Sequence, residues 1–499
     1  MTRLSAWKMT GIVLLLCAAT AIAAPAQTFT TLLTFDGSNG NDSESSLVQG
    51  VDGAFYGTTV AGGSSNNSCG EEGCGTAFRV TATGQLLSSH FSPVQGEGLV
   101  AGLLLAANGN FYGTAYDGGA NFGCDGSVVT CGTVFEVTPT GKITTLYSFC
   151  AQTNCMDGDE PRATLIEGPN GDFYGTSFQG GASGAGTVFK ITADGTFTTL
   201  YNFCQRKNCA DGSMPGAGLV QGTDGDFYGT TEWGGPACMN NSCGTIFKIT
   251  PGGSLTTLHI FHGTDGWIPA GSLVQGPDGN FYGTTEDGGD LTCHGSRGGG
   301  CGTIFTMTPS GALTTLHIFT LTDGVGPIAG LVLGTDGNLY GTTSGYDNGR
   351  KYSDGTIFQI TPQGVLTTLH TFNGTDGANP WGGLLQATNG IFYGATISGG
   401  NFHCGLLQGC GTVFSLDMGL GPFVSFVRNP TKVGQPFGVL GQGFTGTTSV
   451  SLNGTPASFT VKSDTFLEAT VPTGATTGYV TVTTLTGTLT SNVPFHVLP

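Results

Sequence analysis

Aromatic and acidic side chains recur at one position of a repeated sequence unit, the third residue after the motif Phe-Tyr-Gly. The seven occupants of this position are Val60, Tyr116, Phe178, Glu232, Glu286, Ser344 and Ile397. Aromatic rings stack on apolar ligand faces, and carboxylates bind hydroxyl groups or cations. We therefore take Tyr116, Phe178, Glu232, Glu286 and the adjoining Trp233 as candidate binding residues for a sugar or a cation. The alternative is ordinary variability at the ends of loops.

Glu232 and Glu286 are also the first candidates for catalysis. Glycoside hydrolysis uses two carboxyl groups, and such groups can come from distant repeats. However, these two glutamates occupy equivalent positions of adjacent copies, whereas an active site usually breaks the symmetry of a repeat. The sequence contains no Gly-x-Ser-x-Gly, His-Glu-x-x-His or P-loop motif. We predict no catalytic residues, and a polysaccharide-degrading hydrolase or lyase is the alternative.

A second acidic pattern is Asp-Gly-x-x-Pro. It begins at Asp157, Asp211, Asp265, Asp323 and Asp376. Repeated aspartates can bind Ca²⁺, but no 12-residue calcium loop with a terminal Glu is present. Asp-Gly more often makes a turn. We predict turns and no cofactor, with calcium as the alternative. His259, His317 and His370 share their strand position with Tyr147 and Tyr201, so a metal site there is not expected either.

The cysteines form close pairs along the chain. The sequence has 15, and removal of Cys17 with an export signal leaves seven pairs: Cys69/Cys74, Cys124/Cys131, Cys150/Cys155, Cys204/Cys209, Cys238/Cys243, Cys293/Cys301 and Cys404/Cys410. Paired cysteines in an exported protein predict disulfides. Zinc is the competing explanation, but the pairs lack the Cys-x-x-Cys spacing and the histidine partners of a four-ligand site.

The elements that must position these residues come from a repeat of about 56 residues. Phe-Tyr-Gly begins at Phe55, Phe111, Phe173, Phe227, Phe281 and Phe392, and appears as Leu-Tyr-Gly at Leu339. Each copy follows an Asx-Gly pair, which predicts a type I′ hairpin turn. Gly-Thr-x-Phe and a Thr-Thr-Leu strand come later in the unit. In the fourth copy this order predicts strands at 218–221, 226–231, 244–250 and 255–261, and we expect the recurring Phe and Tyr to pack between copies.

The two ends of the repeat region complement each other. The seventh copy lacks a Thr-Thr-Leu strand, whereas residues 30–35 supply one before the first copy. Four short antiparallel strands per copy, seven times, predict an all-β, seven-bladed β-propeller in which the N-terminal strand closes the last blade. A solenoid is the alternative, but it would need distinct terminal caps.

This topology predicts one working face. In each copy the loops between strands two and three, and the connections to the next copy, lie at the same end. All seven cysteine pairs fall in those loops. Variable loops on a rigid scaffold commonly carry binding sites. Protection of exposed loops from proteolysis is the competing role for the disulfides.

Charge and the N-terminus limit the compartment and the partners. The net charge is −18, so an acidic surface would repel nucleic acid and attract cations or basic surfaces. Arg3 and Lys8, the apolar stretch 11–21 and the site Ala24-Pro25-Ala26 predict a signal peptide over residues 1–26. We expect a monomer that is secreted or periplasmic, with association with the cell surface as the alternative, and with no transmembrane segment after signal cleavage.

After residue 421 the repeat stops. Residues 422–499 are expected to form a small β-sandwich with strands at 423–427, 436–441, 449–452, 457–462, 466–470 and 479–484, and Asn453-Gly454 as a hairpin turn. The pieces 441–444, 450–457 and 469–472 resemble the IPT/TIG immunoglobulin-like family.

The repeats at 27–418 look like the tandem repeat named for Gloeobacter and Verrucomicrobia proteins, on the segments 224–231 and 244–250. That resemblance implies an exported bacterial protein, without an implied activity. Together these features predict a non-catalytic binding or scaffold protein whose ligand is a carbohydrate or another surface protein.

Overall fold

The predicted all-β class is confirmed. The computed structural model describes residues 27–63, 69, 73–122, 130–235, 243–293, 299–347, 350–351, 353–401 and 409–498. Within these residues the regular elements are strands and the short 3-10 helices η2 (Thr153–Cys155) and η3 (Lys207–Cys209). The predicted signal peptide, residues 1–26, lies outside them. No helix in the described part of the chain is long and apolar enough to cross a bilayer.

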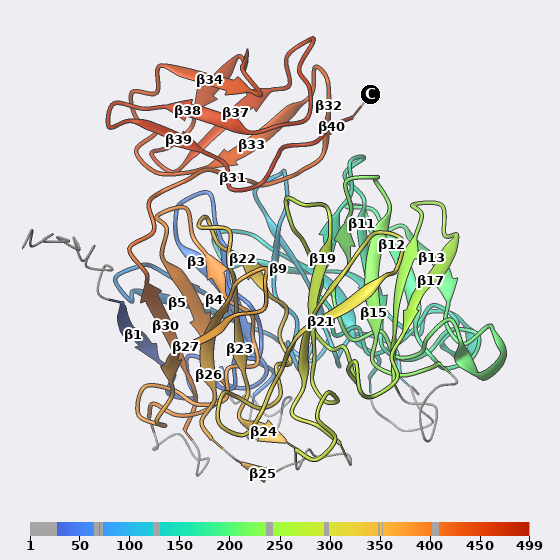
Figure 1. The fold of residues 1–499 in the computed structure, drawn as a ribbon. Coiled ribbons are helices and arrows are strands. Elements are labelled where there is room, and N and C mark those ends of the chain that lie inside the picture. Colours follow the sequence, from blue (N-terminus) through green and yellow to red (C-terminus); the bar gives the residue numbers. More distant parts are fainter. Residues whose placement is uncertain are drawn as a thin grey trace, which may run out of the picture.

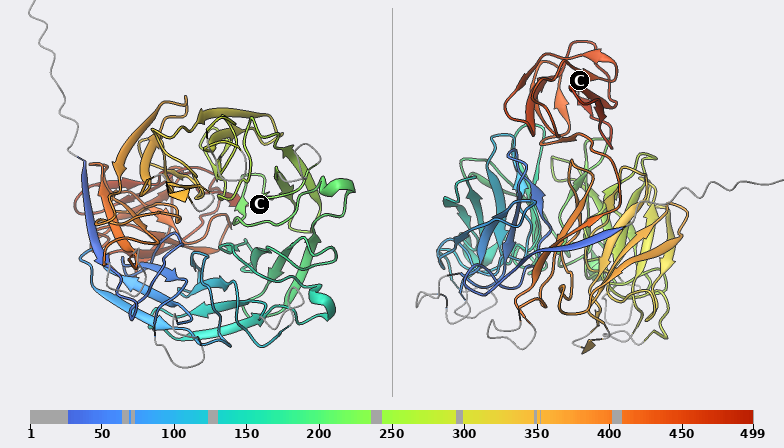
Figure 2. Two further views of the ribbon diagram at one scale, coloured as in Figure 1. Left: turned by 90° about the horizontal axis from the view of Figure 1, so that it is seen from below. Right: turned by 90° about the vertical axis from the view of Figure 1, so that its left-hand side faces the viewer.

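The described residues between 28 and 417 form seven four-stranded antiparallel sheets that are arranged around a ring (Figure 2). Repeats 1 to 3 contain β2 (Val48–Gln49), β3 (Phe55–Thr59), β4 (Thr76–Val80), β5 (Leu86–His90); β6 (Leu104–Leu105), β7 (Phe111–Ala115), β8 (Thr133–Val137), β9 (Ile143–Ser148); and β10 (Ile166–Glu167), β11 (Phe173–Ser177), β12 (Thr187–Ile191), β13 (Phe197–Asn202). Repeats 4 and 5 contain β14 (Val220–Gln221), β15 (Phe227–Thr231), β16 (Thr245–Ile249), β17 (Leu255–Ile260); and β18 (Val274–Gln275), β19 (Phe281–Thr285), β20 (Thr303–Met307), β21 (Leu313–Ile318). Repeats 6 and 7 contain β22 (Val332–Leu333), β23 (Leu339–Thr343), β26 (Thr356–Ile360), β27 (Leu366–Thr371); and β28 (Leu385–Gln386), β29 (Phe392–Ala395), β30 (Thr412–Asp417). Repeat 6 also carries a two-stranded hairpin of β24 (Tyr346–Asp347) and β25 (Arg350–Lys351) (Figure 1).

The N-terminal strand belongs to the last repeat. Strand β1 (Thr28–Thr34) pairs antiparallel with β30, so the seventh sheet has the order β1-β30-β29-β28. The ring is therefore held together by a strand that precedes repeat 1 in the sequence, as the missing Thr-Thr-Leu strand of repeat 7 predicts.

The Phe-Tyr-Gly motif packs neighbouring repeats together. In the second strand of repeats 1 to 5, all five residues are buried. The Tyr ring of one repeat stacks on the Phe ring of the next, with a centroid distance of 4.0 Å for Tyr56 and Phe111 and 4.1 Å for Tyr228 and Phe281. A Cβ atom at Gly229 would lie 2.6 Å from Cζ of Phe247. Glycine therefore leaves room for the Phe of the next strand, and the predicted packing role of the motif is confirmed.

The Asx-Gly turns differ from the predicted type I′. In the turn at Asp52-Gly53 only the glycine has a positive φ, 77°. The Gly50 amide donates to the Ala54 carbonyl, which leaves three residues in the loop. Three-residue hairpin loops combine a type I turn with one left-handed glycine, whereas two-residue loops favour type I′. Asn453 and Gly454 both have positive φ, 46° and 80°, as a type I′ turn requires.

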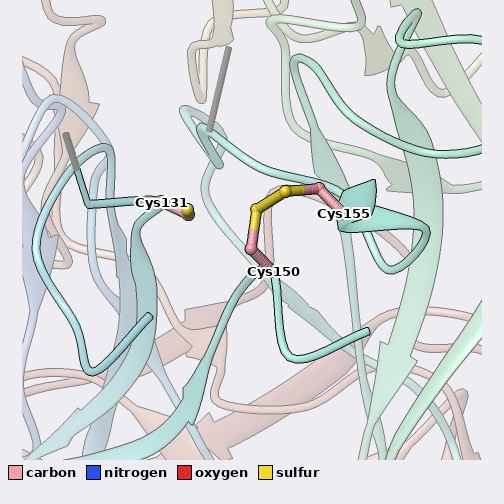
Figure 3. Close-up of side chains that lie close together, drawn as sticks. All are labelled: Cys131, Cys150 and Cys155. Atoms are coloured by element: carbon pink, nitrogen blue, oxygen red, sulfur yellow. A yellow bond between two sulfur atoms is a disulfide. The ribbon is translucent and has the colours of Figure 1, made fainter. Parts of the chain in front are cut away.

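Four of the predicted cysteine pairs are disulfides: Cys69–Cys74, Cys150–Cys155, Cys204–Cys209 and Cys293–Cys301. Cys131, Cys243 and Cys410 are disulfide-bonded as well. Their predicted partners Cys124, Cys238 and Cys404 lie outside the described residues. Figure 3 shows Cys131 facing the Cys150–Cys155 bridge, with sulfur atoms of all three within 4.8 Å of one another. Because these sulfurs are already in disulfides, the cluster is a contact between two loops and offers no thiolate to a metal ion.

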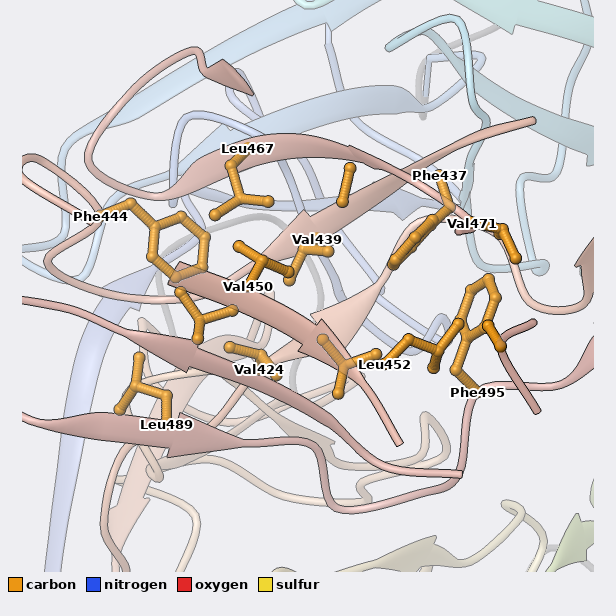
Figure 4. Close-up of a cluster of buried hydrophobic side chains, with 14 residues drawn as sticks. Val424, Phe437, Val439, Phe444, Val450, Leu452, Leu467, Val471, Leu489 and Phe495 are labelled. Carbon is orange, nitrogen blue, oxygen red and sulfur yellow. The ribbon is translucent and has the colours of Figure 1, made fainter. Parts of the chain in front are cut away.

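The C-terminal segment forms two further four-stranded antiparallel sheets. One has the order β31 (Ser425–Phe426), β33 (Pro436–Leu440), β37 (Phe466–Thr470), β36 (Phe459–Val461), and the other the order β35 (Thr455–Pro456), β34 (Ser449–Leu452), β38 (Val480–Thr483), β39 (Thr488–Thr490). Strands β32 (Thr431–Lys432) and β40 (Val497–Leu498) pair in parallel. Side chains from both sheets, among them Val439, Leu467, Val450 and Val482, share one buried apolar cluster (Figure 4). This cluster is a core separate from those of the ring.

This C-terminal domain rests on the face of the ring that carries the Asx-Gly turns (Figures 1 and 2). Thr465 Oγ1 donates to the Val51 carbonyl at 2.8 Å, and Gln442 Nε2 donates to Thr388 Oγ1 at 2.9 Å. Leu440 is buried against apolar side chains of repeats 1 and 2. The connections between repeats and the loops between second and third strands lie at the other face, which the domain leaves open.

Candidate functional site

A cavity of about 480 Å³ is lined by residues from all seven repeats. It is formed by the segments that lead into the innermost strand of each sheet. We call the first position of these segments the inner ring: Glu44, Val100, Arg162, Gly216, Ala270, Ile328 and Trp381. In repeats 3 to 7 this residue directly follows the recurring Pro. The cavity mouth therefore lies at the face that carries the disulfide-bonded loops, opposite the C-terminal domain.

Small residues line the cavity below the inner ring. They are Ser46, Gly102, Thr164, Gly218, Ser272, Gly330 and Gly383, one from each repeat. The Gly218 amide donates to Ser272 Oγ at 3.0 Å, and the Gly383 amide donates to Ser46 Oγ at 2.8 Å. A Cβ atom at Gly330 would lie 2.6 Å from the Ser272 carbonyl oxygen. Adjacent repeats thus approach closely here, and their side chains leave the central space free.

The predicted binding residues divide into two groups. Tyr116 and Glu232 line the cavity, and Phe178 packs against a lining residue. Glu286 and Trp233 are not among the lining residues of the described chain, and the Trp233 backbone forms an isolated bridge with Ser213. The structure therefore places Tyr116, Phe178 and Glu232 at or beside the cavity and leaves Glu286 and Trp233 outside its described lining.

Gly216 explains why Glu232 reaches the cavity. A Cβ atom at Gly216 would lie 2.2 Å from Glu232 Oε1, so the carboxylate occupies space that the glycine leaves open. Repeat 5 has Ala270 at the inner-ring position, so a methyl group stands where Gly216 has only hydrogen. The equivalent glutamate of repeat 5, Glu286, accordingly does not line the cavity.

Arg162 is held between two aromatic rings. Its guanidinium carbon lies 3.8 Å from the ring centroid of Phe178 and 4.5 Å from that of Tyr116. Its Nη2 also donates to Glu160 Oε2 at 2.9 Å. Guanidinium groups stack favourably on aromatic faces. These contacts fix the cation in one wall of the cavity.

Glu44 has a strongly perturbed acidity. Burial and, to a smaller extent, the nearby Asp42 carboxylate raise its pKa to about 8, while Arg162 acts in the opposite direction. Removal of a carboxylate from water disfavours its charged form. Glu44 therefore keeps its proton at neutral pH and can donate a hydrogen bond into the cavity.

The inner ring breaks the symmetry of the repeat. Glu44, Arg162 and the overlying Glu232 form a polar wall across repeats 1 to 4. Repeats 5 to 7 contribute Ala270, Ile328 and Trp381, and the Trp381 side chain is 36% exposed. A cavity with one polar wall and one apolar wall can bind a ligand that itself has hydroxyl groups on one side and carbon on the other.

The aspartates of the Asp-Gly-x-x-Pro motifs form hydrogen bonds with their own loops and with the preceding strand. Asp265 accepts from the His262 amide at 2.7 Å and contacts His259 Nε2 at 3.0 Å. Tyr147 makes the same contact to Asp157, at 2.7 Å. His259, His262 and Asp265 lie close enough for a metal ion. However, a tyrosine replaces the histidine in other repeats, and the carboxylate already accepts hydrogen bonds from the protein. The turn interpretation of these aspartates therefore accounts for their contacts.

A ring of four-stranded antiparallel sheets around a central cavity defines a β-propeller-like protein. The chain belongs to the Gloeobacter/Verrucomicrobia repeat family, whose profile matches residues 65–295 and 291–447. The resemblance predicted from the repeats is thus confirmed. None of the curated protein sequences matches the chain.

Solved structures resemble it at low identity. A Bacteroides uniformis protein assigned as a 6-phosphogluconolactonase is 15% identical, with 65% of this chain and 83% of that chain covered and a TM-score of 0.41. The PQQ-bound aldose sugar dehydrogenase of Streptomyces coelicolor is 12% identical, with coverages of 79% and 98% and a TM-score of 0.38. A Xanthomonas campestris gluconolactonase is 14% identical, with coverages of 62% and 91% and a TM-score of 0.34. Similarity at this level carries no information on activity.

Proposed function

We propose that this chain is a seven-bladed β-propeller with a small immunoglobulin-like domain of the IPT/TIG type, and that it is an exported, non-catalytic protein that binds carbohydrate. The seven sheets and the pairing of β1 with β30 support the blade count. Disulfides in the loops support export to an oxidising compartment, either outside the cell or in the periplasm. The C-terminal domain serves as a spacer or as a second contact surface.

The observation that carries the carbohydrate proposal is the asymmetry of the inner ring. Repeat 7, which carries Trp381, adjoins repeat 1, which carries Glu44, and Arg162 lies three repeats from Trp381 around the ring. A pyranose ring has an apolar face for an aromatic side chain and equatorial hydroxyls for carboxyl and guanidinium groups. The volume of about 480 Å³ accommodates one or two sugar units.

The rigid surroundings favour binding. The lining residues belong to segments held by inter-repeat hydrogen bonds, and the disulfides restrict the loops at the same face. A site that is already ordered loses less conformational entropy when a ligand binds. Short disulfide loops add little to global stability, so we assign to these bridges the role of fixing loop shape.

A glycan array with the purified protein tests the proposal, followed by titration calorimetry with any glycan that binds. Trp381→Ala is expected to weaken binding by about tenfold or more, the effect of a lost aromatic stacking contact. Trp233→Ala is the matched control, because Trp233 does not line the cavity, and its affinity should equal that of the parent. Equal losses in both variants, or retention of binding by Trp381→Ala, would overturn the proposal. Binding of a surface protein without any glycan would do the same.

A second candidate is a polysaccharide-degrading enzyme, and the acidity of Glu44 favours it. A carboxyl group with a pKa of about 8 can act as a general acid, and Glu232 supplies a second carboxyl group in the same cavity. Release of reducing ends from a polysaccharide panel, abolished by Glu44→Gln, would establish this function. Glycan retention without turnover would leave the binding function.

A further inference from the structure

The described lining of the cavity contains more acidic than basic side chains. Arg162 is the single cation among the described lining residues, and Glu160 already pairs with it at 2.9 Å. The acidic lining residues are Glu44, Asp117 and Glu232. Even with Glu44 protonated, the described lining holds two further acidic residues, Asp117 and Glu232, and one arginine, which pairs with Glu160.

The same arrangement disfavours an acidic ligand. Arg162 stacks on Phe178 and Tyr116 and donates Nη2 to Glu160, so only part of its hydrogen-bonding edge remains for a ligand carboxylate. A uronic acid would bring its charge close to Glu232 and Asp117, where like charges repel. The chain as a whole carries −18, which raises the local concentration of cations near the mouth.

Positively charged groups find complementary partners instead. Glu232 holds its carboxylate over Gly216 in the wall of the cavity. Trp381 offers an aromatic face in the same lining, whereas the Tyr116 ring is already stacked on the Arg162 guanidinium. A ligand that spans the cavity can therefore place a protonated amine at the Glu232 carboxylate while a sugar ring stacks on Trp381.

We infer that the cavity selects glycans that carry protonated amines, such as oligomers of glucosamine, over neutral and acidic glycans, with Glu232 as the residue that determines this preference. The inference rests on the proposed carbohydrate function. It adds the charge class of the ligand and the residue that recognises it.

Calorimetric titration of the full exported chain with three oligosaccharides of equal length provides the test: a glucosamine hexamer, its N-acetylated counterpart and a galacturonic acid hexamer, at pH 6 and low salt. We expect the glucosamine hexamer to bind about tenfold more tightly than the N-acetylated form, and the galacturonic acid hexamer to bind weakest. Higher salt should reduce the preference, because screening weakens charge–charge attraction.

Variants separate a specific contact from general attraction to an acidic protein. Glu232→Gln keeps the shape of the side chain and should lower the affinity for the glucosamine hexamer about tenfold. The affinity of this variant for the N-acetylated hexamer should equal that of the parent. Glu286→Gln, at the equivalent position of the next repeat and outside the cavity lining, should leave both unchanged. Equal losses in the two variants, or preference for the acidic hexamer, would overturn the inference. Trp381-dependent binding without an amine preference would refute it and leave the proposed function standing, whereas no Trp381-dependent binding to any hexamer would refute both.

Discussion

Gln49 and Thr388, which lie 339 positions apart in the sequence, are joined by two hydrogen bonds. Gln49 Nε2 donates to Thr388 Oγ1 at 3.0 Å, and the Thr388 amide donates to Gln49 Oε1 at 2.9 Å. Gln275 accepts from the Thr223 amide in the same way, at 3.0 Å, between repeats 4 and 5. Repeats 1 and 7 are therefore joined by the same kind of contact that joins the consecutive repeats 4 and 5.

This contact gives the first prediction. Gln49→Ala leaves the buried Thr388 amide without its acceptor, so the free energy of unfolding should fall by about 1–3 kcal/mol. Urea denaturation followed by fluorescence measures it. Gln85→Ala, at an exposed position, is the control and should change stability by less than about 0.5 kcal/mol. Equal stability of Gln49→Ala and the parent would argue against the closed ring.

The second prediction concerns the glycine of Phe-Tyr-Gly. In Gly229→Ala the new Cβ would lie 2.6 Å from Phe247 Cζ and 2.9 Å from Leu219 Cδ2 in a buried strand. Overpacking of this kind costs about 1–3 kcal/mol, which thermal and urea denaturation detect. Gly252→Ala is the matched control, because its nearest neighbour would be Thr250 Oγ1 at 3.8 Å. A Gly229→Ala variant as stable as Gly252→Ala would contradict the packing described for the motif.

The third prediction is a pH dependence that comes from Glu44. Its pKa is about 8 in the folded chain and near its ordinary value of 4.5 in the unfolded chain, so the folded state holds more protons between these values. Stability contributed by this group therefore falls as pH rises from about 4.5 to about 8. Glu44→Gln removes the titration, so its stability relative to the parent should increase between pH 5 and pH 9. Unfolding free energies of both proteins at the two pH values test this. A constant difference would show that Glu44 does not hold a proton in the folded state.

The repeat pattern was sufficient to predict the architecture of the ring, because each copy carries the same turn, aromatic and glycine signals. Periodicity identifies equivalent positions, but it does not show which of them face the centre of the ring. The inner-ring residues Glu44, Arg162 and Trp381 were missed for that reason, although the position after the recurring Pro is a signal that finds two of them. Glu232 and Glu286 look identical in sequence, and only the contrast of Gly216 with Ala270 separates them.

In the C-terminal domain the longer strands followed from alternating residues, whereas β32, β35, β39 and β40 did not. Each of these four has only two or three residues. Strands this short have too few residues to show a period of two. Their pairing depends on the two larger sheets that are already in place.

The fourth prediction concerns the stacked arginine. Phe178 is 7% exposed beneath the Arg162 guanidinium, so the pair is shielded from water on one side. Arg162→Lys should destabilise the chain by about 1 kcal/mol, because an ammonium group cannot stack in a plane between two rings. Phe178→Leu removes the ring and keeps an apolar side chain. If the stack contributes to stability, the double variant should lose less than the sum of the two single losses, with a coupling of about 0.5–1.5 kcal/mol in urea denaturation. Strict additivity would mean that Arg162 is held by Glu160 and Tyr116 alone.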